Sequence, residues 1–185
     1  AVEEGSPMQP TYGAGHATVA GACVTMLKAF FDTSAVFVVV MRGDKAPKRG
    51  HFWNKDQILE ELKTHGSKVA AGAFVPHCGK KGEPELKCEH YGEYKLDGES
   101  LTYDAHNDHA CPLTLEGELN KLCANISIGR NMAGVHYFSD YYDSARMGEE
   151  IAVGILEEQA LGYTTDPFVM SLPTFDGEAK RIGRR

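Results

Sequence analysis

The sequence predicts an all-α domain that is interrupted by a long irregular insertion, and three observations support this fold class. Apolar residues recur at helical spacing near both ends of the chain, whereas residues 66–111 show no clear period. The chain has 185 residues, of which 42% are apolar and 24% charged, so it can bury the core of one domain. We therefore interpret residues 1–185 as part of a single domain, with residues 32–112 as the insertion or long loop.

The first helix is predicted over residues 16–31. Ala20, Val24, Leu27 and Phe31 fall on one face of this helix. Residues 6–15 are rich in Pro and Gly, which predicts a tight loop that leads into the helix N-terminus.

The predicted insertion differs in composition from the rest of the chain. It holds six of the eight histidines and three of the five cysteines. Within it, residues 36–41 predict a short strand, and residues 56–65 predict a short helix with Asp56 as N-cap and Gly66 as terminator. The stretch from Gly66 to Cys111 is interpreted as a long loop.

Helical spacing returns in residues 114–160. Thr114 is the expected N-cap of a helix, which the pattern from Gly129 to Gly134 interrupts. A further helix is expected from Ser139 or Asp140 to about Ala160, and the tail from Gly162 is interpreted as irregular. The apolar residues that define the two helices are Leu115, Leu119, Leu122, Cys123 and Ile126 in the first and Met147, Ile151 and Ile155 in the second.

Bulk properties narrow the possible functions. The net charge of −7 argues against a general binder of nucleic acid or anionic membranes. No apolar run approaches the roughly 20 residues that a membrane span needs, and no signal peptide is visible. The five cysteines are an odd number, which fits a complete disulfide framework poorly.

Two segments carry residues suited to binding an oxyanion. In Gly13-Ala14-Gly15-His16, a glycine-rich turn enters a helix, whose free N–H groups and dipole favour an anion. In the second segment, Arg130 could supply a fork of donors and His136 a metal ligand or nucleophile, while Asp140 could cap the next helix or orient a histidine. Taken singly, each segment is also consistent with an ordinary turn that carries a surface or core histidine.

Together, Gly-x-Gly-His at residues 13–16 and Arg-x3-Gly-x-His at residues 130–136 resemble two sequence blocks of the vanadium-dependent haloperoxidases. The flanking stretches 17–32, 117–140 and 154–159 look most similar to the bromoperoxidases of red algae and cyanobacteria. The resemblance implies the helical bundle that this family shares with acid phosphatases, and it identifies the chain as a C-terminal, active-site portion.

The resemblance also implies a cofactor and roles for individual residues. Vanadate would be bound by His136 as its metal ligand, with Arg130 and the Gly15 N–H on its oxygens and His16 as the acid–base residue. His16 and His136 are thus the expected catalytic residues. Hydrogen peroxide would oxidise bromide or iodide to hypohalous acid, which halogenates a small organic acceptor. The family resemblance further implies a homo-oligomer and is compatible with an extracellular or cell-wall location.

The sequence departs from the family pattern in several places. Residues 1–15 contain neither the Lys nor the Arg of the family's first block, so we expect an N-terminal portion of the domain to be missing. Ala14 replaces a common Ser, and Gln9 stands where algal enzymes often have a second His. An acid phosphatase and an inactive assembly piece therefore remain alternatives. A structural metal in the His/Cys-rich segment is a further possibility, with zinc suggested by His77, Cys78, Cys88, His90, His106, His109 and Cys111, and calcium by Asp104, Asn107 and Asp108.

Overall fold

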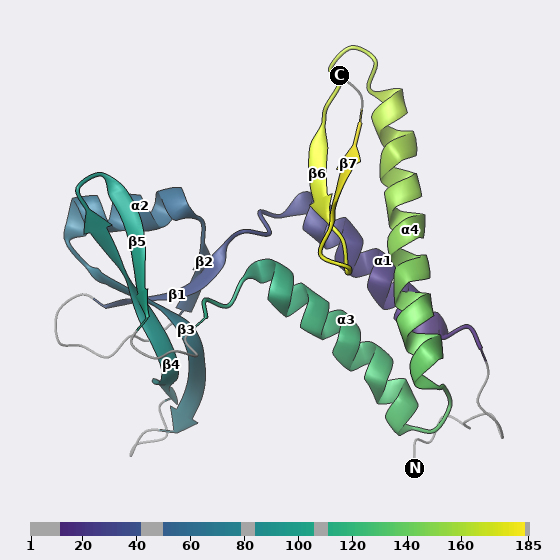
Figure 1. Ribbon diagram of the computed structural model, residues 1–185, viewed down its shortest axis with the longest axis horizontal. Helices are drawn as coiled ribbons and strands as arrows, with labels where there is room; N and C mark the ends of the chain where they lie inside the picture. The colour runs from purple at the N-terminus through teal and green to yellow at the C-terminus, as the bar shows by residue number, and fades with distance from the viewer. Residues whose placement is uncertain (1–11, 42–49, 79–83, 106–110, 184–185) are drawn as a thin grey trace. The chain divides into compact units, whose positions relative to one another are not determined.

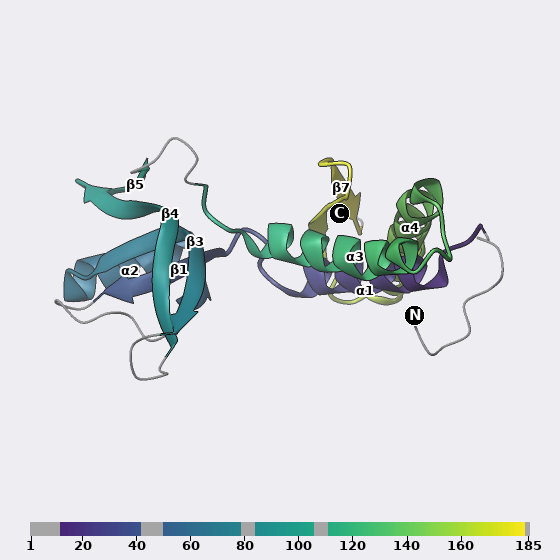
Figure 2. The same ribbon diagram turned by 90° about the horizontal axis from the view of Figure 1, so that it is seen from below.

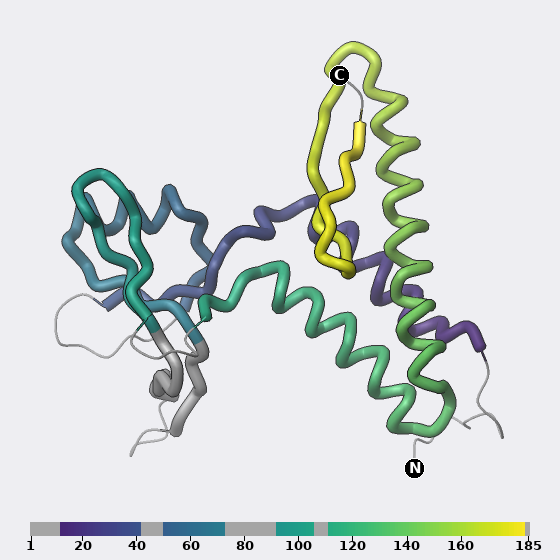
Figure 3. The backbone as a smooth tube through the Cα atoms, viewed as in Figure 1, coloured from purple at the N-terminus to yellow at the C-terminus, as the bar shows by residue number. Residues whose placement is uncertain are grey.

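The structure is a computed structural model that describes residues 12–41, 50–78, 84–105 and 111–183 (Figure 1). For residues 73–78 and 84–91 it describes the backbone course alone, as the grey part of the thicker tube in Figure 3 indicates. The chain divides into two compact units. We call Ala1–Phe31 with Glu118–Arg185 the helical unit, and Asp32–Gly117 the sheet unit.

The sheet unit overturns the predicted fold class, because it contains a five-stranded antiparallel sheet instead of an irregular loop. The strand order is β2-β1-β3-β4-β5. The predicted strand at residues 36–41 is confirmed as β1, but the other strands were not foreseen. The strands are β1 Val36–Met41, β2 Gly50–Trp53, β3 Lys68–Cys78, β4 Pro84–Asp97 and β5 Ser100–Ala105.

Burial explains why β3 gave no recognisable strand pattern. Val69, Ala70 and Ala71 are all buried in β3, so the alternation typical of a half-exposed strand is absent. Strands β4 and β5 are joined by the two-residue turn Gly98–Glu99, since Asp97 pairs with Ser100. Gly98 has a φ of 63°, which such tight hairpin turns require and glycine adopts without strain.

Helix α2, Lys55–His65, packs on this sheet (Figure 2). Its N-cap is Asn54, so the predicted cap at Asp56 is wrong by two residues. Asn54 Oδ1 accepts the Gln57 N–H at 3.0 Å, and Gln57 Oε1 accepts the Asn54 N–H at 3.0 Å. Gly66 ends the helix with a φ of 56°, as predicted. The fully buried Ile58 joins α2 to a core that includes Val38, Val69 and Ala71.

The segments that enter and leave the sheet unit lie side by side. The Phe37 N–H donates to Leu113 O at 2.7 Å, and the Leu115 N–H donates to Ala35 O at 2.8 Å. An isolated bridge pairs Val36 with Thr114 between these two hydrogen bonds. The unit is therefore closed at its base by backbone pairing.

The helical unit confirms the helices predicted outside residues 32–112. Thr114 Oγ1 accepts the Gly117 N–H at 3.1 Å and so acts as the expected cap of the helix that begins at Leu115. The tail predicted to be irregular instead forms a hairpin. The elements are α1 Gly15–Phe30, α3 Leu115–Met132, α4 Phe138–Gly162, β6 Met170–Pro173 and β7 Ala179–Ile182.

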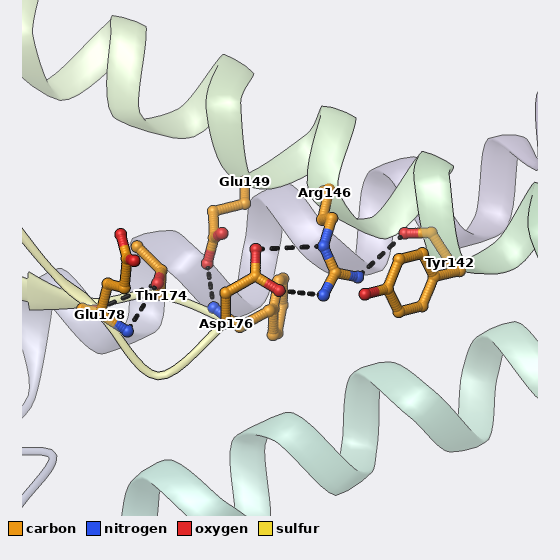
Figure 4. A network of polar contacts seen from close by, with 7 residues as sticks. Tyr142, Arg146, Glu149, Thr174, Asp176 and Glu178 are labelled. Carbon is orange, nitrogen blue, oxygen red and sulfur yellow. Dashed lines mark hydrogen bonds and ion pairs between the residues drawn. The ribbon is translucent and has the colours of Figure 1, made fainter.

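The hairpin β6–β7 covers one part of α4. Leu172 and Ile182 are fully buried against Val153 and Leu156 of this helix. Charged side chains fix the turn between the strands (Figure 4). Buried Glu149 accepts the Phe175 N–H at 2.8 Å, Arg146 forms a two-contact ion pair with Asp176, and Lys28 Nζ donates to Pro173 O at 3.1 Å.

Helix α4 meets α1 through small residues, and the predicted apolar face of α4 is not the face that packs on α1. Met147, Ile151 and Ile155 are each between 44% and 49% exposed. Gly148 and Ala152 are buried instead, because α1 and α4 approach closely at this stripe. None of the helices in the described ranges is long and apolar enough to cross a membrane.

Candidate functional site

The first predicted motif lies at the N-terminus of α1. Gly13 has a φ of 91° and turns the chain into the helix, and Ala14 is the N-cap in extended conformation without a side-chain cap. The Thr18 N–H is the first to donate within the helix, to Ala14 O at 3.0 Å. The N–H groups of Gly15, His16 and Ala17 therefore come before the first hydrogen bond within the helix and have no acceptor inside it. Gly15 and His16 are exposed, so an anion could reach this helix end.

The second motif spans the turn from α3 to α4. Helix α3 continues to Met132, so the break predicted from Gly129 begins later, and Arg130 lies in the last helical turn. Gly134 has a φ of 76° and reverses the chain, with its N–H donating to Asn131 O at 2.9 Å. Glycine is needed here because other residues rarely adopt this conformation. Arg130 is half-buried, and its Nε atom is inaccessible to solvent.

Asp140 has the capping role considered for it and also lies beside His136. Its Oδ2 accepts the Tyr137 N–H at 2.9 Å and so caps the start of α4. The same oxygen lies 3.7 Å from Nδ1 of His136, which is longer than a hydrogen bond but within ion-pair distance. The two side chains are only 10% and 3% exposed. A carboxylate that accepted a hydrogen bond from Nδ1 would orient the ring and leave Nε2 for a ligand, as is usual for metal-binding histidines.

The two motifs are joined through α4. The Ala14 N–H donates to Ser144 Oγ at 2.9 Å, across 130 residues of sequence. Asp140 and Ser144 are one helical turn apart and both buried, so His136 and Ala14 contact neighbouring positions on one face of α4. The structure thus connects the loop of Gly15 and His16 with the segment of His136. A shared anion site among Gly15, His16, Arg130 and His136 stays a prediction.

This donor set fits vanadate in kind. An oxyanion with one imidazole ligand needs a histidine of fixed orientation, a guanidinium and backbone N–H groups, and the helical unit carries all three. Within the described ranges, no cluster of three or more His, Cys, Asp or Glu side chains is placed to hold a metal ion. The calcium prediction thus finds no support, and Asp104 pairs with Lys95.

Several predicted residues cannot be placed. Gln9, Asn107 and Asp108 lie outside the described residues. Among the zinc candidates, Cys111 has a described side chain, which is exposed. Those without a described side chain are His77, Cys78, Cys88, His90, His106 and His109.

No family model matches the chain. Over 182 residues, or 98% of the chain, it is 41% identical to the vanadium-dependent bromoperoxidases of Corallina officinalis and Corallina pilulifera. The chain resembles one segment of a vanadium-dependent bromoperoxidase. It spans 21% of the length of these two relatives, and 23% of the length of the Ascophyllum nodosum bromoperoxidase, to which it is 27% identical. The resemblance inferred from the two motifs is confirmed.

Sequence reasoning missed some residues around the bromoperoxidase-like motifs. Ser144 gave no signal, because a serine within a helical pattern is usually a solvated or locally bonded residue. Its distant partner, Ala14, has no polar side chain that could have revealed the contact. Buried Lys28 and Glu149 were missed for a similar reason, since charged residues are almost never fully buried unless they are paired.

Proposed function

We propose that this chain forms the vanadate-binding part of a bromoperoxidase. That enzyme uses hydrogen peroxide to oxidise bromide or iodide to hypohalous acid, which then halogenates a small organic acceptor. The observation that carries the proposal is the 41% identity over 98% of the chain, a range that includes both oxyanion motifs. Vanadate, when bound, would supply a Lewis acid that activates peroxide.

The residues of the chain have separate tasks in this proposal. His136 binds the metal through Nε2, and Asp140 holds the imidazole in place from the Nδ1 side. Arg130 and the Gly15 N–H bind oxygens of the anion and balance part of its charge. His16, exposed at the end of α1, exchanges a proton with the bound ligand or with peroxide. Further cations, which residues 1–15 do not supply, would come from polypeptide beyond this chain.

Homo-oligomerisation is part of the proposal. It is supported by the exposed apolar face of α4 that Met147, Ile151 and Ile155 form, because such faces mark interaction surfaces. Sedimentation of the purified protein would measure the number of subunits.

The competing function is an assembly piece that does no chemistry, and the absence of Lys and Arg from residues 1–15 favours it. An assay of the protein at its full natural length separates the possibilities. The proposal predicts bound vanadium and peroxide-dependent bromination of a dye. Hydrolysis of a phosphomonoester without bromination would indicate a phosphatase, and neither activity would indicate the assembly piece.

The ligand assignment has its own test. His136→Ala should abolish binding of vanadate, whereas His65→Ala, which alters an exposed histidine of α2, should leave it unchanged. Equilibrium dialysis against orthovanadate measures both variants. Bound vanadium that persists in His136→Ala would refute the assignment.

A further inference from the structure

Ser144 is a fully buried polar residue that the proposed chemistry does not use directly. It is 0% exposed, and its Oγ accepts the N–H of Ala14, which is itself 2% exposed. A buried serine within a helix can bond to the carbonyl one turn earlier, as Ser127 does to Cys123 O. The hydroxyl of Ser144 is instead directed to the residue that immediately precedes Gly15 and His16.

The surroundings of this hydrogen bond leave little room for α1 to move. One turn further along α4, a Cβ on Gly148 would lie 2.0 Å from Thr18 O. In α1, about one turn after Thr18, a Cβ on Gly21 would lie 2.2 Å from Ala145 O. The two backbones are therefore in direct contact within the helical turn that follows Ser144, and the hydrogen bond to Ala14 adds a contact at the start of α1.

We propose that Ser144 is a positioning residue for the anion site. Through its hydrogen bond to Ala14, it holds the N–H groups of Gly15 and His16 next to α4. They then lie one helical turn from Asp140, the residue beside His136. This inference rests on the proposed bromoperoxidase function. Asp140 and Ser144 are separated by one helical turn, about 6 Å, so the two contacts place both halves of the site on one rigid face. Removing the acceptor would leave the Ala14 N–H buried and unsatisfied, and the first turn of α1 would shift to recover a partner.

The experiment compares Ser144→Ala with Thr25→Val in the protein at its full natural length. Thr25 is a matched control, because its fully buried hydroxyl bonds only within α1, to Gly21 O at 2.8 Å. Both variants lose one buried hydroxyl and should melt at a lower temperature. Ser144→Ala alone should raise the Kd for orthovanadate about tenfold and change the vanadium-51 resonance of the bound anion. Ser144→Cys, whose sulfur is a weak acceptor, should give an intermediate Kd.

Each outcome has a separate meaning. If wild-type protein binds no vanadate, the proposed function fails and this inference fails with it. If wild-type protein binds vanadate and folded Ser144→Ala binds it equally well, only the positioning role of Ser144 is overturned. An equal rise in Kd for Thr25→Val would also overturn it, because the effect would then reflect general loosening of α1. If Ser144→Ala does not fold, the Kd of Ser144→Cys relative to wild type decides in the same way.

Discussion

The close crossing of α1 and α4 gives a stability prediction that can be worked from distances. In Gly148→Ala, the new Cβ would lie 2.0 Å from Thr18 O and 2.7 Å from Ala22 N, whereas ordinary contacts begin at 3.4 Å. The obstructing atoms belong to the backbone, so no side chain can rotate away. The helices must separate by about 1.4 Å to restore a 3.4 Å contact, which forfeits at least about half of each dispersion contact across the interface.

The magnitude follows from two opposing effects. Overpacking of this kind costs about 3 kcal/mol, whereas replacing a helical glycine by alanine returns about 1 kcal/mol. Gly148→Ala should thus lower the free energy of unfolding by about 2 kcal/mol. Gly154→Ala is the control on the same helix, because a Cβ there meets nothing within 4 Å. It should raise the free energy of unfolding by up to about 1 kcal/mol.

Denaturant unfolding followed by far-ultraviolet circular dichroism measures both variants, since this signal comes mainly from helices. The fluorescence of Trp53, the single tryptophan of the chain, reports on the sheet unit in the same samples. If Gly148→Ala is as stable as Gly154→Ala, the backbones of α1 and α4 do not meet as described.

Two further predictions concern the cap of α2 and the buried carboxylate of α4. Asn54→Ala should destabilise the sheet unit by about 1 kcal/mol, because the Asn54 side chain caps α2. Asp56→Ala should destabilise it by less, and Trp53 fluorescence during unfolding measures both variants. Equal losses of stability would contradict the capping pattern. Burial raises the pKa of Glu149 above its usual 4.5, so the folded state holds the proton more tightly than the unfolded state. Wild-type stability should therefore fall relative to Glu149→Gln as the pH rises above 4.5 through the raised pKa. A difference in unfolding free energy between wild type and Glu149→Gln that is constant with pH would contradict this linkage.

The sequence predicted those elements whose signals are local. The helices α1, α3 and α4 were found because apolar periodicity survives over many turns, and β1 was found because Val36–Met41 is a continuous apolar run. Strand β3 was missed because its consecutive buried residues remove the alternation of a half-exposed strand. The buried face of a helix was harder to predict than the position of the helix in the sequence. The large residues Met147 and Ile151 define the apolar face of the α4 pattern, but the buried positions beside them are Gly148 and Ala152.

The residues proposed for the site likewise carry local signals. Gly15, His16, Arg130 and His136 stand in short motifs that a reader of the sequence can recognise. The contact that ties Ala14 to Ser144 depends on the crossing of two helices 130 residues apart in sequence, and no local pattern encodes such a crossing.

The paired base of the sheet unit has a consequence for how the chain can be rearranged. Ala35 and Leu115 are joined by a backbone hydrogen bond, so the polypeptide leaves and returns at nearly one point. Neighbouring antiparallel strands are about 5 Å apart, a gap that a short turn can bridge. The intervening residues could therefore be excised and replaced by such a turn, or grafted into a surface loop of another protein, without stretching either host backbone. A module attached in this way can be gained or lost as a single block.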